Sequence, residues 1–290
     1  MIGVYFETWA CPWTDKVENC ALANVDADKV FLAFAYPNCT YKKGSYSWDG
    51  TGLQFSFGFD IVRRSISILQ SRGTRVYLSV GGGSYSFTIY KTQNVIDLAN
   101  DLGVDGIDLD FEPQKPMKPV ESQDQFIQII KQTRGLYKKE ISLAAFAAGC
   151  FDPVKGDDYR GSMLKVIDQT KQDIQFINLM NYDAGSGWDY KAAYLSYKRY
   201  YSGPIYYGLE VGPQGWGDAY LTLEDIKKAK EYNTDDYWFV WAYFKSGTPD
   251  FQAVKNSLRS KPDTSPPVSD KPLLVLCPNC HQGVIEIRSK

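Results

Sequence analysis

Short runs of apolar residues recur between Ile2 and Tyr243, each rich in the β-branched and aromatic side chains that strands favour. Several of these runs are apolar almost without interruption, as in parallel strands that are buried on both faces. The pattern predicts eight strands, which span Ile2–Thr8, Lys29–Tyr36, Arg75–Gly81, Gly106–Glu112, Glu140–Ala147, Ile174–Tyr182, Ile205–Glu210 and Tyr237–Tyr243.

Segments with helical periodicity lie between these runs. Their apolar residues recur three and four positions apart, as in Ile61-Val62-Ile66-Leu69, Phe126-Ile127-Ile129-Ile130, Met163-Leu164-Ile167 and Ile226-Ala229. Alternating strands and helices indicate parallel β/α units, and eight such units fit a (β/α)8 TIM barrel of typical size. We therefore expect an α/β barrel with its active site where the strands end. The long Tyr-, Gly- and Ser-rich stretch 37–59 is expected to pass over the barrel mouth.

The composition changes after Leu258, where a polar and Pro-rich segment begins. We predict a barrel domain over residues 1–260, a linker over 261–272 and a short C-terminal tail over 273–290. The tail contains Cys277, Cys280 and His281 in a C-x-x-C-H arrangement that resembles half of a zinc ribbon, with two of the four ligands that structural zinc needs. The alternative is a tail with two free thiols.

Charge and composition exclude several function classes. The 32 Lys and Arg residues nearly balance the 34 Asp and Glu residues, so no broad cationic surface exists for nucleic acid. The single histidine, His281, removes Ser-His-Asp triads and histidine general bases from the predicted barrel. Acid-base chemistry must then fall to carboxyl groups and tyrosines. The 21 Tyr and 7 Trp residues suit a surface that stacks on sugars, although core packing explains most of them.

No apolar run is long enough to span a membrane, and the first residues lack the features of a secretion signal. We expect a cytoplasmic protein unless an N-terminal signal has been removed. Six cysteines are few for this length. One disulfide is compatible with the group Cys11, Cys20 and Cys39, and the sequence does not choose the pair.

Four carboxyl groups lie in the eight residues from Asp105 to Glu112, within an otherwise apolar strand. Because strand side chains alternate, Asp108, Asp110 and Glu112 share one face and point into the barrel together. Ionising all three is disfavoured at this spacing, so at least one pKa should rise towards the value a general acid needs. Asp105 falls off this face, and a structural role for it is as plausible as a catalytic one.

The spacing D-x-x-D-x-D-x-E resembles the signature of glycoside hydrolase family 18, the chitinase family. Ser79-Val80-Gly81-Gly82 is similar to the family's S-x-G-G, and Met180-Asn181-Tyr182-Asp183 to its M-x-Y-D. The first-strand run Val4–Trp9, the second-strand run Ala33–Ala35 and Trp241 in the eighth strand match further family positions. The resemblance covers residues 2 to about 245 and implies the same barrel fold.

The resemblance implies a retaining endo-chitinase that cleaves β-1,4-linked N-acetylglucosamine through an oxazolinium intermediate, with the substrate's acetamide as nucleophile. Glu112 would be the general acid, Asp110 would face the acetamide N–H, and Asp108 would share a proton with Asp110. Tyr182 would complete the catalytic set. Substrate-binding positions would be Asp183, Met180, Trp241, Tyr5 and Phe34, although plain barrel packing is the alternative for the three aromatic residues. Ser79, Gly81 and Gly82 would let the acidic strand pack closely.

The chain also departs from the larger chitinases. Too few residues separate Glu210 from Tyr237 for the α+β domain that deepens the groove in many members, so we expect a shallow, open cleft. Glu210 would end its strand at the mouth and either bind a sugar hydroxyl or pair with a loop cation. We expect a monomer that binds chitin or N-acetylglucosamine oligosaccharides and needs no cofactor or metal. The alternatives are an endo-β-N-acetylglucosaminidase acting on N-glycan core, an enzyme acting on peptidoglycan, and a catalytically silent chitin-binding lectin.

Overall fold

The computed structural model describes residues 1–113, 115–185, 187–212, 221–260, 275–276 and 284–285. The chain divides into two compact units, Met1–Leu258 and Arg259–Lys290. In the second unit, β9 (Val275–Leu276) pairs antiparallel with β10 (Val284–Ile285). The predicted linker 261–272 and the residues Cys277, Cys280 and His281 lie outside the described residues, so the zinc-ribbon hypothesis stays a prediction.

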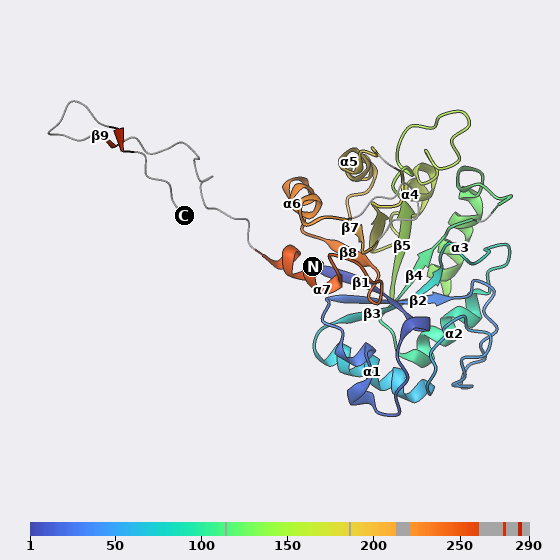
Figure 1. Cartoon of the computed structure of the whole chain (residues 1–290). Helices are drawn as coiled ribbons and strands as arrows, with labels where there is room; N and C mark the ends of the chain where they lie inside the picture. The colour runs from blue at the N-terminus through green and yellow to red at the C-terminus, as the bar shows by residue number, and fades with distance from the viewer. Residues whose placement is uncertain (114, 186, 213–220, 261–274, 277–283, 286–290) are drawn as a thin grey trace. The chain divides into compact units, whose positions relative to one another are not determined.

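The first unit is a closed parallel barrel, as the alternating pattern predicts (Figure 1). Each strand pairs with the next, and β8 pairs with β1. The strands are β1 (Ile2–Glu7), β2 (Lys29–Ala35), β3 (Arg75–Gly81), β4 (Gly106–Asp110), β5 (Glu140–Phe146), β6 (Phe176–Met180), β7 (Ile205–Glu210) and β8 (Trp238–Trp241). Several strands end earlier than predicted. In particular, β4 ends at Asp110 and β6 at Met180, so Glu112, Tyr182 and Asp183 belong to the loops that follow.

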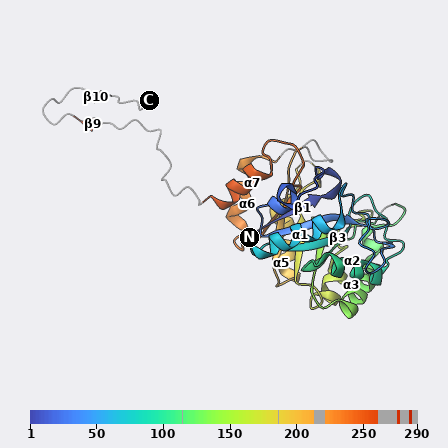
Figure 2. The ribbon, with the colours of Figure 1, turned by 90° about the horizontal axis from the view of Figure 1, so that it is seen from below.

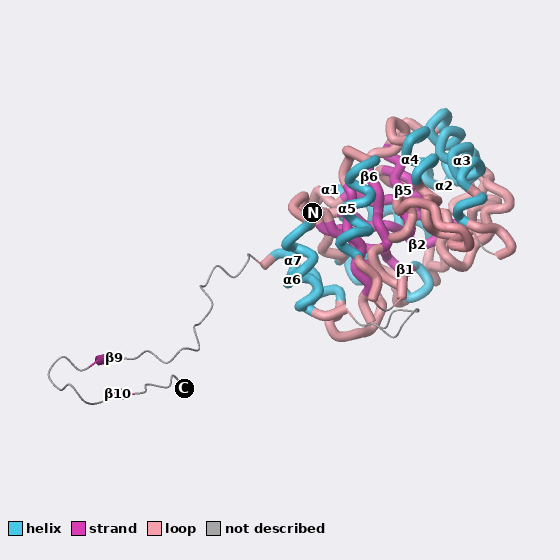
Figure 3. The backbone as a smooth tube through the Cα atoms, turned by 90° about the horizontal axis from the view of Figure 1, so that it is seen from above, coloured by secondary structure: helices cyan, strands magenta, loops and turns pink. Residues whose placement is uncertain are grey.

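In the described part of the chain, seven α-helices lie around the outside of the strands (Figure 3). They are α1 (Phe59–Ser71), α2 (Thr92–Leu102), α3 (Gln123–Leu136), α4 (Leu164–Thr170), α5 (Tyr190–Tyr200), α6 (Leu223–Tyr232) and α7 (Phe251–Arg259). The helices α1, α2 and α3 lie side by side (Figure 2). Short 3-10 turns occur at Thr8–Ala10, Val17–Asn19, Leu22–Asn24 and Pro119–Glu121. Helical periodicity correctly predicts α1, α3, α4 and α6.

Each helix buries one apolar stripe against the barrel. In α1 the buried positions Val62, Ile66 and Leu69 follow the three- and four-residue spacing of one helix face. Inside the barrel, a cluster of mostly aromatic side chains fills the space that the strands enclose. This is expected of a barrel with a packed core rather than a pore. The barrel interior therefore offers no channel, and a site must lie at one end.

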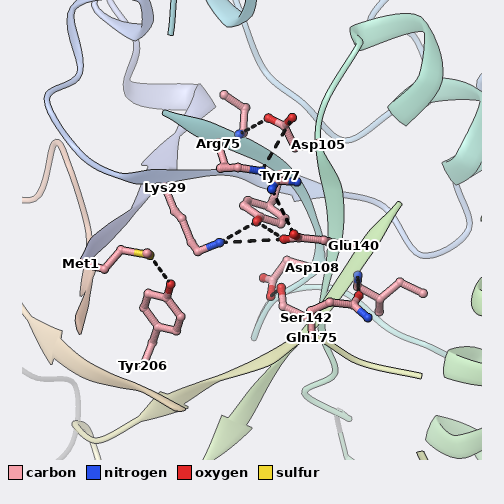
Figure 4. A network of polar contacts seen from close by, with 12 residues as sticks. Met1, Lys29, Arg75, Tyr77, Asp105, Asp108, Glu140, Ser142, Gln175 and Tyr206 are labelled. Atoms are coloured by element: carbon pink, nitrogen blue, oxygen red, sulfur yellow. Dashed lines mark hydrogen bonds and ion pairs between the residues drawn. The ribbon is translucent and has the colours of Figure 1, made fainter. Parts of the chain in front are cut away.

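The end where the strands begin is closed by a network of polar contacts (Figure 4). Lys29 Nζ donates to Tyr77 Oη at 2.7 Å, and Tyr77 Oη donates to Glu140 Oε2 at 2.5 Å. Arg75 Nη1 pairs with Glu140 Oε1 at 3.1 Å. Asp105 Oδ2 accepts the backbone N–H of Val76 at 2.8 Å, so the structural interpretation of Asp105 is confirmed. These contacts leave the opposite end, where the strands finish, for chemistry.

The stretch 37–59 reaches the barrel mouth only in part. Gln54 N donates to Thr8 Oγ1 at 3.1 Å beside the mouth. Elsewhere the stretch packs outward, where Trp48 stacks on Phe59 and Tyr41 Oη donates to Asp101 Oδ2 at 2.8 Å. The expected excursion over the mouth is therefore limited to the segment around Gln54.

The cysteines of the described residues are all buried and free: Cys11, Cys20, Cys39 and Cys150. The sequence is compatible with one disulfide in the group Cys11, Cys20 and Cys39, and the structure has no disulfide among the described cysteines. Cys11 and Cys20 lie in hydrogen-bonding contact, and this contact lowers the pKa of the Cys20 thiol to about 6. Within the described part of the chain, no helix is long and apolar enough to cross a membrane.

We expect residues after Ser260 to be dispensable for folding of the barrel. The closing strand β8 and the helix α7 both precede this point, and Lys255 Nζ on α7 already binds Asp26 Oδ2 at 2.6 Å. A chain ending at Ser260 should melt within about 2 °C of the full chain, since surface changes cost little. Circular dichroism during heating measures this, and a larger drop would show that the tail supports the barrel.

Candidate active site

A cavity of about 880 Å³ opens where the strands end, a volume in the range of ligand sites. Its lining combines acidic and aromatic side chains, and no Lys, Arg or His lines it among the described residues. The acidic lining residues are Asp110, Glu112, Asp157, Asp183 and Glu210; the aromatic ones are Trp9, Phe34, Tyr85, Phe146, Tyr159, Tyr182, Trp188 and Trp241. An anionic, ring-lined cavity suits a neutral or cationic ligand with flat apolar faces.

Asp108 lies beneath this cavity and is fully buried. Its Oδ2 accepts hydrogen bonds from Tyr5 Oη at 2.8 Å and Ser79 Oγ at 2.7 Å. Its Oδ1 accepts from Ser142 Oγ at 2.7 Å and Asn178 Nδ2 at 3.3 Å. Burial raises the pKa of Asp108 and these four donors oppose the rise. The four donors favour the ionised form of Asp108 and so oppose the effect of burial.

Asp110, two positions further along the same face of β4, has a contrasting environment. It is 4% exposed, and its Oδ1 is buried without a hydrogen-bond partner among the described residues. Burial raises the pKa of Asp110 well above its usual value, and the charges of Glu112 and Asp108 raise it further. The rise in pKa is stronger at Asp110 than at Asp108, so a proton in this part of the site is favoured on Asp110.

Glu112 lies on the loop after β4 and lines the cavity. The backbone N–H of Gly83 donates a hydrogen bond to its carboxyl group. Burial raises the pKa of Glu112 to about 7, with a contribution from the Asp183 charge, although the Gly83 hydrogen bond lowers it. A carboxyl group with this pKa holds a proton near neutral pH and can donate it, which is what a general acid requires.

Small residues at the end of β3 and just after it allow β4 to approach. Gly82 N donates to Asp110 O at 2.9 Å, and a Cβ on Gly81 would lie 2.1 Å from that same oxygen. Gly81 also has a φ of 110°, a region that other residues rarely adopt. A Cβ on Gly82 would lie 2.8 Å from the Phe34 ring. These contacts agree with the packing role predicted for the two glycines.

The loop after β6 supplies Tyr182 and Asp183. Burial raises the pKa of Tyr182 well above its usual value, and so do the charges of Asp110, Glu210, Glu112 and Asp183. The Tyr182 hydroxyl therefore stays protonated and can donate a hydrogen bond. Asp183 has a φ of 57°, in the left-handed region, which Asp tolerates better than most residues. Such strain is characteristic of functional sites.

Stacked aromatic rings form one wall of the cavity. Trp241 stacks on Phe34 with ring centroids 5.6 Å apart, and Trp9 stacks on the same ring at 6.3 Å. Trp9 is 45% exposed, so its face is available to a ligand. Phe34 and Trp241, which the sequence predicts as binding residues, thus form a continuous apolar surface with Trp9.

Of the predicted site residues, seven line the cavity and two do not. Asp108 and Tyr5 lie below it, and the Tyr5 hydroxyl is occupied by Asp108 and by Asn178 Nδ2 at 3.0 Å. The residues that line the cavity are Phe34, Asp110, Glu112, Met180, Tyr182, Asp183 and Trp241. Sequence reasoning missed Tyr159 and Trp188 as lining residues. The one available signal was their position on the loops after β5 and β6.

The family model described as Glycosyl hydrolases family 18 matches residues 1–216. The chain belongs to this family. It is therefore a glycoside hydrolase, and the resemblance in the strand motifs is confirmed.

Solved family 18 structures share the fold at low identity. A GH18 chitinase from Pseudoalteromonas aurantia superposes with a TM-score of 0.64 at 19% identity, covering 88% of this chain and 97% of that chain. A fungal endo-β-N-acetylglucosaminidase of family 18 gives 0.60 at 18%, covering 89% and 95%. A xylanase and α-amylase inhibitor protein from Scadoxus multiflorus gives 0.55 at 17%, covering 83% and 92%. At these identities the likeness concerns the fold alone.

Proposed function

We propose that this family 18 protein is a retaining endo-chitinase that hydrolyses β-1,4-linked N-acetylglucosamine. The observation that carries the proposal is the convergence of Glu112, Asp110 and Tyr182 on one cavity with Trp241 in its wall. A protonated carboxyl, a buried carboxyl, a tyrosine hydroxyl and an apolar ring surface are what acetamido-sugar chemistry needs.

In the first step, Glu112 donates its proton to the glycosidic oxygen. The bond from that oxygen to the anomeric carbon breaks, and the acetamide carbonyl oxygen of the same sugar forms a new bond to this carbon. The product is a cyclic oxazolinium ion, and the leaving sugar departs with the proton. In the second step, Glu112 accepts a proton from water, and the water oxygen forms a bond to the anomeric carbon. The bond between this carbon and the acetamide oxygen breaks, which restores the acetamide and gives net retention of configuration.

Charge develops on the acetamide nitrogen during the first step. Asp110 stabilises the N–H of the oxazolinium ion, because its buried Oδ1 has no partner in the described part of the chain and is left to accept this hydrogen bond. The Tyr182 hydroxyl donates a hydrogen bond to the acetamide oxygen, and Asp183 completes the polar lining. Met180 and Trp241 support the ring.

Asp108 and Tyr5 act from beneath. In the free enzyme the charge of Asp108 favours the protonated form of Asp110. The two carboxyl groups share this proton, and its transfer to Asp108 lets Asp110 face the oxazolinium ion as a carboxylate. Tyr5 is 2% exposed and donates to Asp108, so we assign it to holding Asp108 in place rather than to contact with a sugar.

Two alternatives use the same cavity. Cleavage of N-glycan core finds support in the fold shared with the fungal endo-β-N-acetylglucosaminidase. A silent carbohydrate-binding role is disfavoured because Glu112 is present and has a pKa of about 7. Incubating the protein side by side with chitin oligosaccharides and a high-mannose glycopeptide, followed by mass spectrometry of the products, separates the three. Cleavage of the glycopeptide alone would overturn the proposal.

The pKa of Glu112 predicts the basic limb of the pH profile. Since the acid must be protonated, kcat/KM should fall as pH rises through about 7, where the free enzyme loses this proton. Initial rates on chitotetraose between pH 5 and 9 measure the limb. A kcat/KM that stays constant or increases from pH 7 to 9 would contradict the assignment of Glu112 as the acid.

A further inference from the structure

Glu210 is a buried carboxyl group of the cavity that the steps above do not use. It ends β7, lines the cavity and is only 4% exposed. Lys245 Nζ binds its Oε1 in an ion pair. Its other oxygen, Oε2, is buried and accepts no hydrogen bond from any residue that the structure describes. A buried acceptor without a donor destabilises the fold, so we expect a donor from outside the protein to bind Oε2.

The position of Lys245 fixes the direction of this carboxyl group. Lys245 lies on the loop after β8, and that loop is tied closely to the end of β7. Val211 N donates to Trp241 O at 2.7 Å, and a Cβ on Gly212 would lie 2.6 Å from Ser246 O. With Oε1 held by the lysine on this packed loop, Oε2 keeps a fixed orientation.

Glu210 also lies among the groups assigned to the reacting sugar. The Asp183 charge acts on Glu210, and the Glu210 charge acts in turn on Tyr182. On the next strand, β8 ends at Trp241, whose backbone pairs with Glu210 in register. The carboxyl group therefore lies between the acetamide-binding loop and the aromatic wall.

Glu7, at the same end of the barrel, is a carboxyl group with a purely structural role and can be compared with Glu210. It ends β1, is 8% exposed and feels the charge of the same Lys245. Its Oε2 accepts the backbone N–H of Phe244 at 2.6 Å, and the residue does not line the cavity. Glu210 differs from Glu7 in both respects, because no backbone N–H of the described residues donates to its Oε2 and its side chain lines the cavity. Holding the loop after β8 in place therefore does not by itself explain Glu210.

We propose that Glu210 is a further substrate-binding residue, whose Oε2 accepts a hydrogen bond from a hydroxyl group of the sugar that lies against Trp241. An internal unit of a β-1,4-linked N-acetylglucosamine chain has two free hydroxyl groups, on C3 and C6, and one of them is the donor. The inference rests on the proposed function, because the acceptor is assigned to the same sugar-binding cavity.

Glu210→Gln tests this binding role. Lys245 keeps the amide oxygen of the new side chain facing its ammonium group, so an NH₂ group takes the place of Oε2. This group donates and cannot accept the hydroxyl proton. Burial raises the pKa of Glu210 to about 7, although the ion pair with Lys245 lowers it, so the test is run at about pH 8, where Oε2 is an unprotonated acceptor. Because the bond to this acceptor is present in both bound substrate and transition state, KM should rise about 10- to 100-fold, with kcat changed by no more than about threefold.

Glu7→Gln is the matched control, since it makes the same change beside the same lysine without altering the cavity. Its KM and kcat should equal those of the wild type. Analogues of chitotetraose that lack one hydroxyl group provide the second measurement. Either the 3-deoxy or the 6-deoxy analogue should bind the wild type more weakly than the parent, and this difference should vanish in Glu210→Gln.

The outcomes separate the two proposals. A wild type that cleaves chitotetraose, with Glu210→Gln unchanged in KM, would overturn the role of Glu210 and leave the endo-chitinase proposal standing. An equal rise of KM in Glu7→Gln would likewise overturn it, because the effect would then come from the loop. A wild type that neither binds nor cleaves the oligomers would overturn the proposed function, and the binding role of Glu210 with it.

Discussion

Glu112→Gln should retain the fold and bind chitin oligosaccharides, while kcat falls by about 10²- to 10⁴-fold, the usual contribution of a general acid. The amide has the size of the acid and still accepts the Gly83 N–H through its oxygen. It has no proton to give to the glycosidic oxygen. Steady-state rates on chitotetraose, together with binding of the same oligomer by calorimetry, measure the two effects separately.

Glu121→Gln is the appropriate control, because Glu121 is a solvent-exposed glutamate on the 3-10 turn Pro119–Glu121. Its rates should match the wild type. If Glu112→Gln kept more than a tenth of the wild-type kcat, another group would have to supply the proton.

A stable thiazoline analogue of the oxazolinium ion should bind the protein at least about 10²-fold more tightly than the substrate, since such a mimic resembles the high-energy state. The positive ring faces Asp110, whose buried Oδ1 lacks a partner among the residues that the structure describes. Asp110→Asn should weaken binding of the analogue and lower kcat together. Asp183→Asn should have a smaller effect on both. Competitive inhibition and calorimetry measure the affinities.

The same mechanism predicts that fully deacetylated chitosan oligomers bind through the aromatic wall and are not cleaved, because they have no acetamide to attack the anomeric carbon. Cleavage of these oligomers at the rate of chitin oligomers would exclude the acetamide as nucleophile. Detection of the α-anomer as the first product by NMR would exclude it equally, since retention gives the β-anomer.

Much of the fold could be predicted from the sequence because buried parallel strands leave near-continuous apolar runs. The carboxyl groups of β4 were predictable for a related reason: three acids on one strand face have no structural use in an apolar core. The residues at which the strands end were harder to predict from the sequence. Glu112 continues the alternating pattern of β4, yet hydrogen bonding to β3 stops at Asp110, so the acid belongs to a loop.

Other parts of the site depend on contacts between segments that are distant in the chain. Glu210 and Lys245 are 35 positions apart, and no local pattern pairs them. Tyr159 and Trp188 lie on loops whose path follows from packing rather than from periodicity. Trp9 belongs to a family motif, but the motif does not show what this half-exposed tryptophan packs against. The structure shows that it stacks on Phe34.

The left-handed backbone at Asp183 limits which residues this position can accommodate. Glycine, asparagine and aspartate adopt such a φ readily, whereas other side chains pay about 1–2 kcal/mol. Among these three, only aspartate brings a carboxylate to the cavity, and glutamate has the charge without the backbone tolerance. The left-handed backbone and the need for a carboxylate in the cavity therefore both restrict the side chain at this position. An alanine variant would combine two defects in one measurement, while asparagine isolates the loss of charge.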